Sequence, residues 1–399
     1  MNSELNNHTV REVSGARAVA AMLILGISGA TMMVIMPGVF GALTANSVLG
    51  TDSIAWLAFG EMTGITAATL GVSFKTRSLD HRKIAVLALV ILALADAASA
   101  RLGPLVPLVA TRLIAGLSEG VLIATMASLV ARTAQPDRLF GLYMACNLGV
   151  STILLAVLGV LAGAHHGRAI FYVLILIIGV AAAMLGWLPR PQVPTVDHSP
   201  LEPRASSPGQ VVGLAGTLVL FIGLGASWPQ VGEIGRVLQL PPEAVPFAMS
   251  VATFMGIVSG LLAALCGARF GRRAPVIAGT LMLGLSMILV AGAGSRASFT
   301  VAVSAFMFAY IFIVPYYTGI MARLDRHGRM AAISMALQFL GMALGPLAST
   351  LLIGHGLRLI FWVAAGLCIP SLGLILAAEA RGRDVRGDST PVVVQFAGE

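Results

Sequence analysis

Apolar residues run in long segments along almost the whole chain, separated by short clusters of Arg, Lys, Pro and Gly. A helix needs roughly 20 mostly apolar residues to cross the hydrocarbon core of a bilayer. The pattern therefore predicts an all-α membrane protein with twelve transmembrane helices. We expect them at residues 18–41, 53–74, 84–100, 105–130, 139–163, 169–188, 211–234, 244–267, 275–294, 299–321, 331–354 and 359–378.

The longest polar interruption, residues 189–210, follows the sixth apolar segment and is rich in Pro and Ser. This composition is typical of a flexible linker. We therefore expect an N-terminal six-helix bundle at residues 1–188 and a C-terminal six-helix bundle at residues 211–380. The polar tail at residues 381–399 is expected to be disordered.

A short internal repeat suggests that the two halves are related. Residues 131–147 and 322–338 carry Arg, Met and Ala at matching positions, and Asn147 corresponds to Gln338. The repeat falls between segments four and five and again between segments ten and eleven. A duplicated six-helix unit would place it there.

Composition excludes several classes of protein. The chain is 57% hydrophobic and 11% charged, whereas soluble domains are about 25% charged, so its charges are too few to cover a surface in water. The net charge of +8 is spread over many short loops, which argues against nucleic-acid binding. The three cysteines lie in apolar runs without metal-binding spacing, so no metal site is expected.

The basic residues predict the orientation of the chain. With the N-terminus in the cytoplasm, 19 of the 25 Lys and Arg residues fall on the cytoplasmic side, five on the outer side, and Arg112 within a span. This asymmetry follows the positive-inside rule and places both termini in the cytoplasm. Arg greatly outnumbers Lys, which hints at a GC-rich bacterial genome and hence at the cytoplasmic (inner) membrane of a bacterium.

Basic loops occupy matching places after segments two and eight. Residues 268–273 read Ala-Arg-Phe-Gly-Arg-Arg, and residues 75–83 carry four further Lys and Arg residues after Gly71. Segment four contains Arg112 followed four residues later by Gly116. These features, with the six-plus-six arrangement, resemble the major facilitator superfamily of transporters.

The resemblance implies specific matches and departures. In the first loop Gly71 matches, and the positions matching the D-R-x-G-R-R loop of the superfamily are Arg269, Gly271, Arg272 and Arg273. Lys75 and Ala268 stand where the superfamily has Asp, and Ser78 stands where it has Gly. The resemblance implies two pseudo-symmetric six-helix bundles joined on the cytoplasmic side by charge pairs that are weakened or rebuilt here. Segment five lacks the Gly-Pro pattern of many exporters, which lowers the case for proton-driven drug efflux.

Five charged residues lie within the apolar segments: Glu61, Asp96, Arg112 and Glu119, with Glu233 near the outer end of segment seven. Such residues are costly in a bilayer and are usually paired, interior and functional. Arg112 and Glu119 share one helix face but lie about 10 Å apart along the axis, which is long for a direct pair. Glu61 lies at a matching depth and is the first candidate partner of Arg112, with Asp96 as the rival.

We expect Glu119 to bind the coupling proton or a cationic group of the substrate, because a carboxyl group removed from water takes up a proton more readily. Arg112 is expected to hold an anionic substrate group or to tune the carboxylate, and the face that carries both is expected to look into a central cavity. The alternative is a purely structural polar network that locks the helices together.

Segments one, four, seven and ten line the cavity in the resembled superfamily. Trp228 is an interfacial aromatic or a cavity gate, and Tyr310 lies 191 residues after Glu119 and corresponds to it across the repeat. Met32 belongs to a methionine-rich wall or to ordinary packing. The predicted cavity residues are Arg112, Glu119, Tyr310, Trp228, Met32, Asn147 and Gln338.

The function expected from these features is secondary active transport of a small organic solute by alternating access, without a cofactor and with the proton gradient as energy source. Export of a metabolite or drug-like compound is slightly favoured over uptake of an organic anion with protons. A membrane-embedded enzyme is a remote alternative. No His lies within the predicted segments to act as a base, and His-Glu-x-x-His and Walker motifs are absent from the sequence. The expected partners are the solute and the lipid bilayer, with no nucleic acid, and a monomer is expected.

Overall fold

The computed structural model describes residues 15–45, 50, 52–75, 80–130, 133, 136–163, 167–189, 207–266, 272–324 and 329–387, and all regular structure within these ranges is helical. The α-helices are α1 (Ala16–Ala45), α2 (Asp52–Lys75), α3 (His81–Ser99), α4 (Leu105–Val130), α5 (Pro136–Gly163), α6 (Ile170–Met184), α7 (Pro208–Ser227), α8 (Val231–Val237), α9 (Ala244–Cys266), α10 (Arg273–Ala291), α11 (Arg296–Arg323), α12 (Arg329–Ile353) and α13 (Leu357–Gly387). Three short 3₁₀ helices are η1 (Gly167–Ala169), η2 (Leu185–Trp187) and η3 (Trp228–Gln230).

Each of the twelve predicted segments corresponds to a helix in the described part of the chain. The seventh is broken into α7, η3 and α8 next to Pro229, which has no N–H to continue the helical hydrogen bonds. Within the described residues, ten spans are long and apolar enough to cross a membrane. The helices α2 and α3 are not among these ten, and they carry Glu61 and Asp96 on buried positions.

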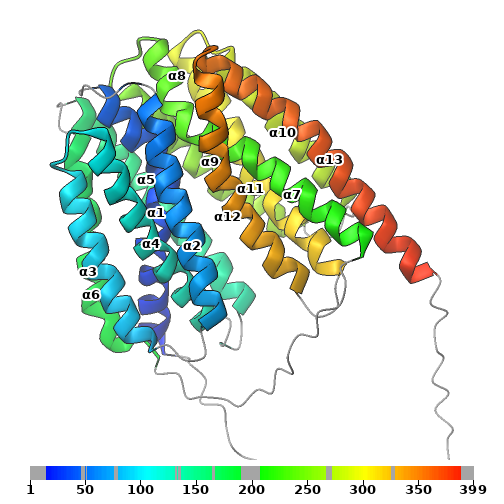
Figure 1. Ribbon diagram of the computed structural model, residues 1–399, viewed down its shortest axis with the longest axis horizontal. Helices are drawn as coiled ribbons and strands as arrows, with labels where there is room; N and C mark the ends of the chain where they lie inside the picture. The colour runs from blue at the N-terminus through cyan, green and yellow to red at the C-terminus, as the bar shows by residue number, and fades with distance from the viewer. Residues whose placement is uncertain are drawn as a thin grey trace, which may run out of the picture.

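The helices form two bundles that lie side by side (Figure 1). Within the first, α4 packs on α1, α2 and α3, and α1 also packs on α5 and α6. Within the second, α7 packs on α12 and α13, while α11 packs on α9 and α10. The predicted all-α fold of two six-helix bundles is therefore confirmed.

The bundles touch at one end of the molecule and diverge toward the other (Figure 1). We call the end where α1 begins and α13 ends the terminal face, and the other end the opposite face. Contacts between the bundles join α2 to α12, α5 to α9, and α1 to η3 and α8. Near the opposite face the position of a Gly159 Cβ would lie 3.5 Å from the Glu243 carbonyl oxygen, and at mid-molecule Thr66 Oγ1 donates to the Phe339 carbonyl at 3.0 Å.

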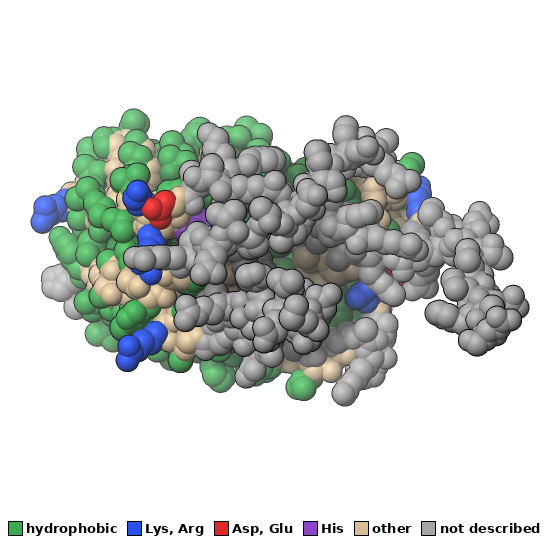
Figure 2. Space-filling model, turned by 90° about the horizontal axis from the view of Figure 1, so that it is seen from below, with side chains coloured by type: hydrophobic (Ala, Val, Ile, Leu, Met, Phe, Trp, Pro, Cys, Tyr) green, Lys and Arg blue, Asp and Glu red, His purple; other side chains and the backbone are tan. Residues whose placement is uncertain are grey.

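The sides of the molecule are apolar. Large hydrophobic side chains such as Leu87, Leu94, Val106, Leu176 and Leu351 are more than half exposed. Seen from the terminal face, hydrophobic side chains surround the molecule, and Lys and Arg side chains appear on this end (Figure 2). A water-soluble protein rarely exposes so continuous an apolar surface, whereas lipid chains would cover it.

Helix ends at the terminal face are fixed by polar caps. Asp80 begins α3 by accepting hydrogen bonds from the backbone N–H groups of Lys83 and Arg82. These bonds hold the pKa of the Asp80 carboxyl below its usual range. Ser207 and Gln210 form a capping box that begins α7 at Pro208. This helix thus begins inside the stretch predicted as a linker, of which residues 190–206 lie outside the described residues.

The last helix is longer than predicted. Residues 381–387 continue α13, although their composition predicted disorder from residue 381. Residues 377–380 are Ala, Ala, Glu and Ala, and three of residues 381–387 are Arg. Ala, Glu and Arg are good helix formers. Glu379 in the same helix also pairs with Arg273 Nε at 3.1 Å, which ties α13 to α10. Residues 388–399 of the predicted tail lie outside the described residues.

Candidate functional site

Small residues bring α2 and α4 into close contact. Gly60 and Gly64 of α2 face α4, while Gly116 and Gly120 of α4 face α2. A Cβ on Gly116 would overlap the carbonyl oxygen of Glu61, and a Cβ on Gly60 would lie 3.1 Å from the carbonyl oxygen of Val109. Small residues four apart permit such approach between membrane helices. The consequence is that Glu61 on α2 reaches the guanidinium on α4.

Arg112 is the centre of a network of three carboxyl groups. Its Nε and Nη2 donate to the two oxygens of Glu61 at 3.2 and 3.1 Å. Its Nη1 donates to Asp96 Oδ1 at 2.9 Å, and Nη2 lies 3.5 Å from Glu119 Oε1. We call these four residues the charge cluster.

Two further residues complete the surroundings of Arg112. The Nη1 atom also donates to Ser99 Oγ at 3.3 Å, and the guanidinium carbon lies 5.5 Å from the centre of the Phe171 ring. Nothing in the sequence pattern singles out these two residues. The sequence could indicate Ser99 as a neighbour of Arg112 only because Ser99 lies one helical turn after Asp96.

The charge cluster is sealed from solvent. The side chains of Glu61 and Arg112 are 0% exposed, and those of Asp96 and Glu119 are 3% and 2% exposed. The cluster therefore lies inside the N-terminal bundle, between α2, α3 and α4. The predicted placement facing a central cavity is wrong for this conformation, because the partners of Arg112 come from α2 and α3 of its own bundle.

The predicted pairing needs two corrections. Glu61 and Asp96 are both partners of Arg112, so they are not rivals. Glu119 is also in contact with Arg112, although the axial separation argued against it. Side chains on a helix lean toward its N-terminus, which carries the Glu119 side chain toward Arg112, and the two side chains meet at 3.5 Å.

The charges of the cluster do not balance. Three carboxylates face one guanidinium, which leaves two negative charges when all are ionised. Burying unbalanced charge costs several kcal/mol. The arrangement is thus suited to taking up and releasing a proton.

A second feature joins the two bundles near the opposite face. Pro37 lies inside α1 and has no N–H, so the carbonyl of Met33 loses its partner in the helix. The indole Nε1 of Trp228, from η3 of the other bundle, donates to this carbonyl at 3.2 Å. Gly232 of α8 packs directly on the Pro37 carbonyl, since a Cβ at that position would overlap the oxygen.

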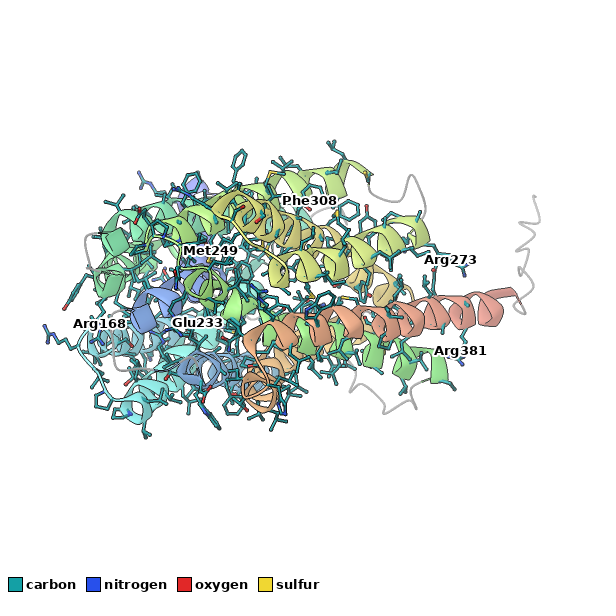
Figure 3. All side chains as sticks on the ribbon, turned by 90° about the horizontal axis from the view of Figure 1, so that it is seen from above. Arg168, Glu233, Met249, Arg273, Phe308 and Arg381 are labelled. Carbon is teal, nitrogen blue, oxygen red and sulfur yellow. The ribbon has the colours of Figure 1, made fainter. Side chains whose placement is uncertain are left out.

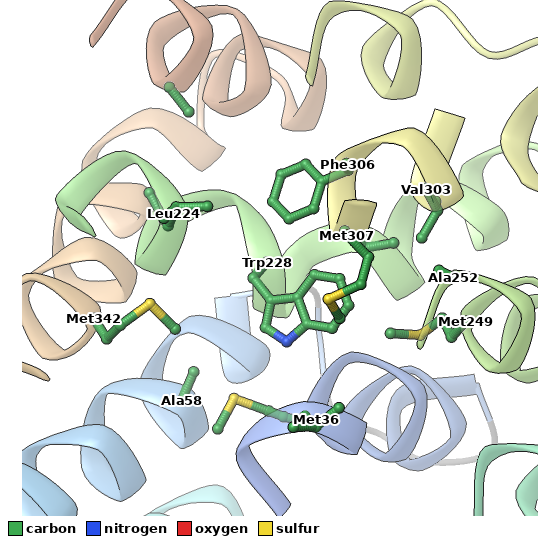
Figure 4. Close-up of a cluster of buried hydrophobic side chains, with 14 of the residues drawn as sticks. Met36, Ala58, Leu224, Trp228, Met249, Ala252, Val303, Phe306, Met307 and Met342 are labelled. Atoms are coloured by element: carbon green, nitrogen blue, oxygen red, sulfur yellow. The ribbon is translucent and has the colours of Figure 1, made fainter. Parts of the chain in front are cut away.

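Apolar side chains from both bundles surround Trp228 (Figure 4). Its ring stacks on Phe306 of α11 with centroids 5.6 Å apart and 14° between the planes. Met36 of α1, Met249 of α9 and Met342 of α12 belong to the same buried cluster. Trp228 is 5% exposed, so it sits within the closed contact between the bundles and not at the lipid interface.

The other predicted cavity residues lie apart from one another. Met32 is buried beside the charge cluster, and Asn147 Oδ1 lies 3.2 Å from the Thr31 hydroxyl oxygen. Tyr310 packs edge-on against Phe221, with centroids 6.2 Å apart. Gln338 Nε2 donates to the Thr318 hydroxyl at 3.2 Å. The structure does not bring these side chains together around one space, and their role in binding a solute stays a prediction.

The predicted loop motif is only partly described. Gly71 is exposed near the end of α2, while Arg269 and Gly271 lie outside the described residues. Arg272 precedes α10 and lies against Gly319 of α11. Arg273 pairs with Glu379 of α13, so this pair joins two helices of one bundle. Figure 3 shows Arg273 at the end of the C-terminal bundle remote from Glu233.

The described helices share their fold with solved transporter structures. The structure is similar to that of a POT family transporter in complex with 5-aminolevulinic acid, with a TM-score of 0.72, 10% identity, and coverage of 92% of this chain and 96% of the other. A mutant of the nucleoside transporter NupG gives a TM-score of 0.71 at 10% identity over 90% and 99% of the two chains. A D-xylose-proton symporter gives 0.69 at 13% identity over 90% and 96%.

Comparison of sequences finds similarity over a smaller part of the chain than comparison of structures. No protein-family model matches the chain. Multidrug resistance protein 2 of Bacillus subtilis (strain 168) is 25% identical over 170 residues. That match spans 40% of this chain and 40% of the length of the relative.

Proposed function

We propose that the chain is a secondary active transporter that moves a small organic solute across the membrane by alternating access and is coupled to protons. The observation that carries the proposal is the buried charge cluster, in which three carboxyl groups share one guanidinium within a transporter fold. Its unbalanced charge gives a reason for proton uptake. The contacts at one face and the divergence at the other are those expected of one of two alternating conformations.

The solute site is proposed to lie between the bundles, separate from the charge cluster. This separation follows from the complete burial of Arg112 and Glu119 within one bundle. The partial similarity to a multidrug resistance protein supports export of a metabolite or drug-like compound as the first hypothesis. Uptake of a small organic anion with protons remains the second, because solved neighbours include a proton symporter.

Replacing Glu119 with glutamine tests proton coupling. The substitution Glu119→Gln keeps the size of the side chain but removes its ability to exchange a proton. Coupling free energies between two sites are typically 1–3 kcal/mol, so we expect accumulation driven by a pH gradient to fall by about tenfold or more. Exchange of solute without a gradient is expected to persist.

The measurement uses inverted vesicles with and without a pH gradient and a panel of ethidium, D-xylose and 5-aminolevulinic acid. Glu243→Gln is the matched control, since Glu243 is exposed at the opposite face and far along the chain from the cluster. Unchanged gradient-driven accumulation in Glu119→Gln contradicts the assignment of Glu119. The absence of gradient-driven movement of every compound contradicts proton-coupled transport.

We further propose that both termini lie in the cytoplasm of a bacterium, with the chain in its inner membrane. The support is the distribution of Lys and Arg between alternate loops. Alkaline phosphatase needs disulfides that form outside the cytoplasm, so a fusion after Gly387 is expected to be inactive and a fusion after Arg101 active. Activity of the C-terminal fusion would reverse the orientation.

A further inference from the structure

A small cavity borders the charge cluster inside the N-terminal bundle. Its volume is about 10 Å³, and it lies between α1, α3, α4 and α6. The polar side chains that line it are Ser28, Thr31, Asp96 and Glu119. This volume is close to the least that admits one water-sized particle.

The hydroxyl groups that line the cavity donate their protons to backbone carbonyls of α1 and not into the cavity. Ser28 Oγ donates to the carbonyl of Ile24 at 2.9 Å. Thr31 Oγ1 donates to the carbonyl of Ile27 at 2.7 Å and also lies 3.2 Å from Asn147 Oδ1. Because each hydroxyl has a single proton, both present only lone pairs to the cavity.

Arg112 cannot supply the missing donor. A guanidinium has five N–H groups. Four of them donate to Glu61, Asp96 and Ser99, and Nη2 also lies 3.5 Å from Glu119 Oε1. Glu119 Oε2 is buried and has no hydrogen-bond partner among the described residues. The cavity is thus lined by oxygen acceptors on every polar position and by no donor.

The charge count suits a single monovalent cation. One proton on any of the three carboxyl groups reduces the charge of the cluster from −2 to −1. A monovalent cation in the cavity would bring it to zero. Calcium takes 6–8 oxygen ligands and magnesium needs an octahedral set, which is more than four side chains around so small a space provide.

We propose that this cavity binds one sodium ion through Glu119 Oε2, Asp96 and the hydroxyl oxygens of Ser28 and Thr31. The inference rests on the proposed function and adds a second cation to the coupling site. It differs from the sequence prediction of no metal site, which considered Cys and His spacing and not buried hydroxyl groups. Two of the ligands belong to α1, the helix that also carries Pro37 and the contact with Trp228.

Purified full-length protein is titrated with NaCl, with KCl or choline chloride holding ionic strength constant, while Tm is measured. Sodium is expected to raise Tm by a few degrees, as a ligand that binds only the folded state must, and potassium is not. Thr31→Val removes one ligand oxygen and keeps the shape of the side chain, so the apparent Kd for sodium should rise at least about tenfold, by the conversion of about 1.4 kcal/mol per factor of ten.

Thr217→Val is the matched control, because Thr217 is buried in α7 and its hydroxyl donates to the carbonyl four residues back, like that of Thr31. It should leave the sodium effect unchanged. Equal Tm values in sodium and potassium, or an unchanged sodium effect in Thr31→Val, overturn the site. If proton-driven transport and its loss in Glu119→Gln persist in sodium-free vesicles while the sodium effect is absent, this inference fails and the proposed function stands.

Discussion

Replacing Arg112 with glutamine is expected to lower the Tm of the purified protein by more than about 5 °C and to abolish gradient-driven transport. The substitution leaves Glu61, Asp96 and Glu119 buried without a positive charge. Removing one partner of a buried ion pair costs about 3–5 kcal/mol. Arg112→Lys restores the charge but offers three donors in place of five, so it should recover stability only in part.

The difference in Tm between wild type and Arg112→Gln should depend on pH. At low pH the three carboxyl groups are protonated and no longer need a cation, so the Tm difference between wild type and Arg112→Gln should shrink as pH falls. It should be largest at neutral and higher pH, where the carboxyl groups tend to ionise. The measurement is Tm of both proteins between pH 4 and pH 8.

Two variants make this test specific. Arg358→Gln removes an arginine that is exposed at the opposite face and should leave Tm unchanged. Adding Glu61→Gln to Arg112→Gln removes one of the orphaned charges and should restore part of the stability, as expected for residues in one network. A wild-type Tm for Arg112→Gln at neutral pH would show that the cluster does not hold its charges in the folded state.

The sequence predicts the fold in detail because the membrane leaves few alternatives. In a bilayer every backbone group must be satisfied within its own helix, so apolar length locates most of the spans. The helices α2 and α3 do not meet that criterion. Broken helices are harder to predict. Trp228-Pro229 is visible in the sequence, but the division into α7, η3 and α8 depends on how α1 packs against this segment.

The sequence predicts which residues form the candidate site, but it does not predict how their side chains are arranged. The four charged residues are evident because charge is rare in apolar segments. Their arrangement depends on contact between α2 and α4, which the paired glycines at residues 60, 64, 116 and 120 permit. The acceptor-lined cavity escapes prediction, because it depends on the direction of two hydroxyl protons in α1.

Gly232→Ala is expected to open the contact between the bundles at the opposite face. A Cβ on residue 232 would overlap the Pro37 carbonyl oxygen, and it would also lie 3.4 Å from Gly41 Cα. The added methyl group must push α8 away from α1. The clash is between backbone and side chain within the closed contact, so it disfavours this conformation and leaves the packing inside each bundle intact.

One buried side chain in the closed contact between the bundles disfavours that contact. Gln230 is 0% exposed, and both polar atoms of its amide lack a hydrogen-bond partner among the described residues. Leaving such groups unpaired costs about 1–3 kcal/mol each. If opening hydrates this amide, the two conformations are close in free energy, and a modest clash at Gly232 is enough to shift their populations.

Spin labels at Arg101→Cys and Arg358→Cys, placed after the three native cysteines are replaced by alanine, report the separation of the bundles at the opposite face. Gly232→Ala should increase the population at longer distance. Trp228→Phe keeps the ring that stacks on Phe306 but removes the donor to Met33, so it should shift the distribution in the same direction by less. Gly179→Ala is the control, because no atom lies within 4 Å of the added Cβ. An unchanged distance distribution in Gly232→Ala would mean that the approach of α8 to α1 does not set the closed state.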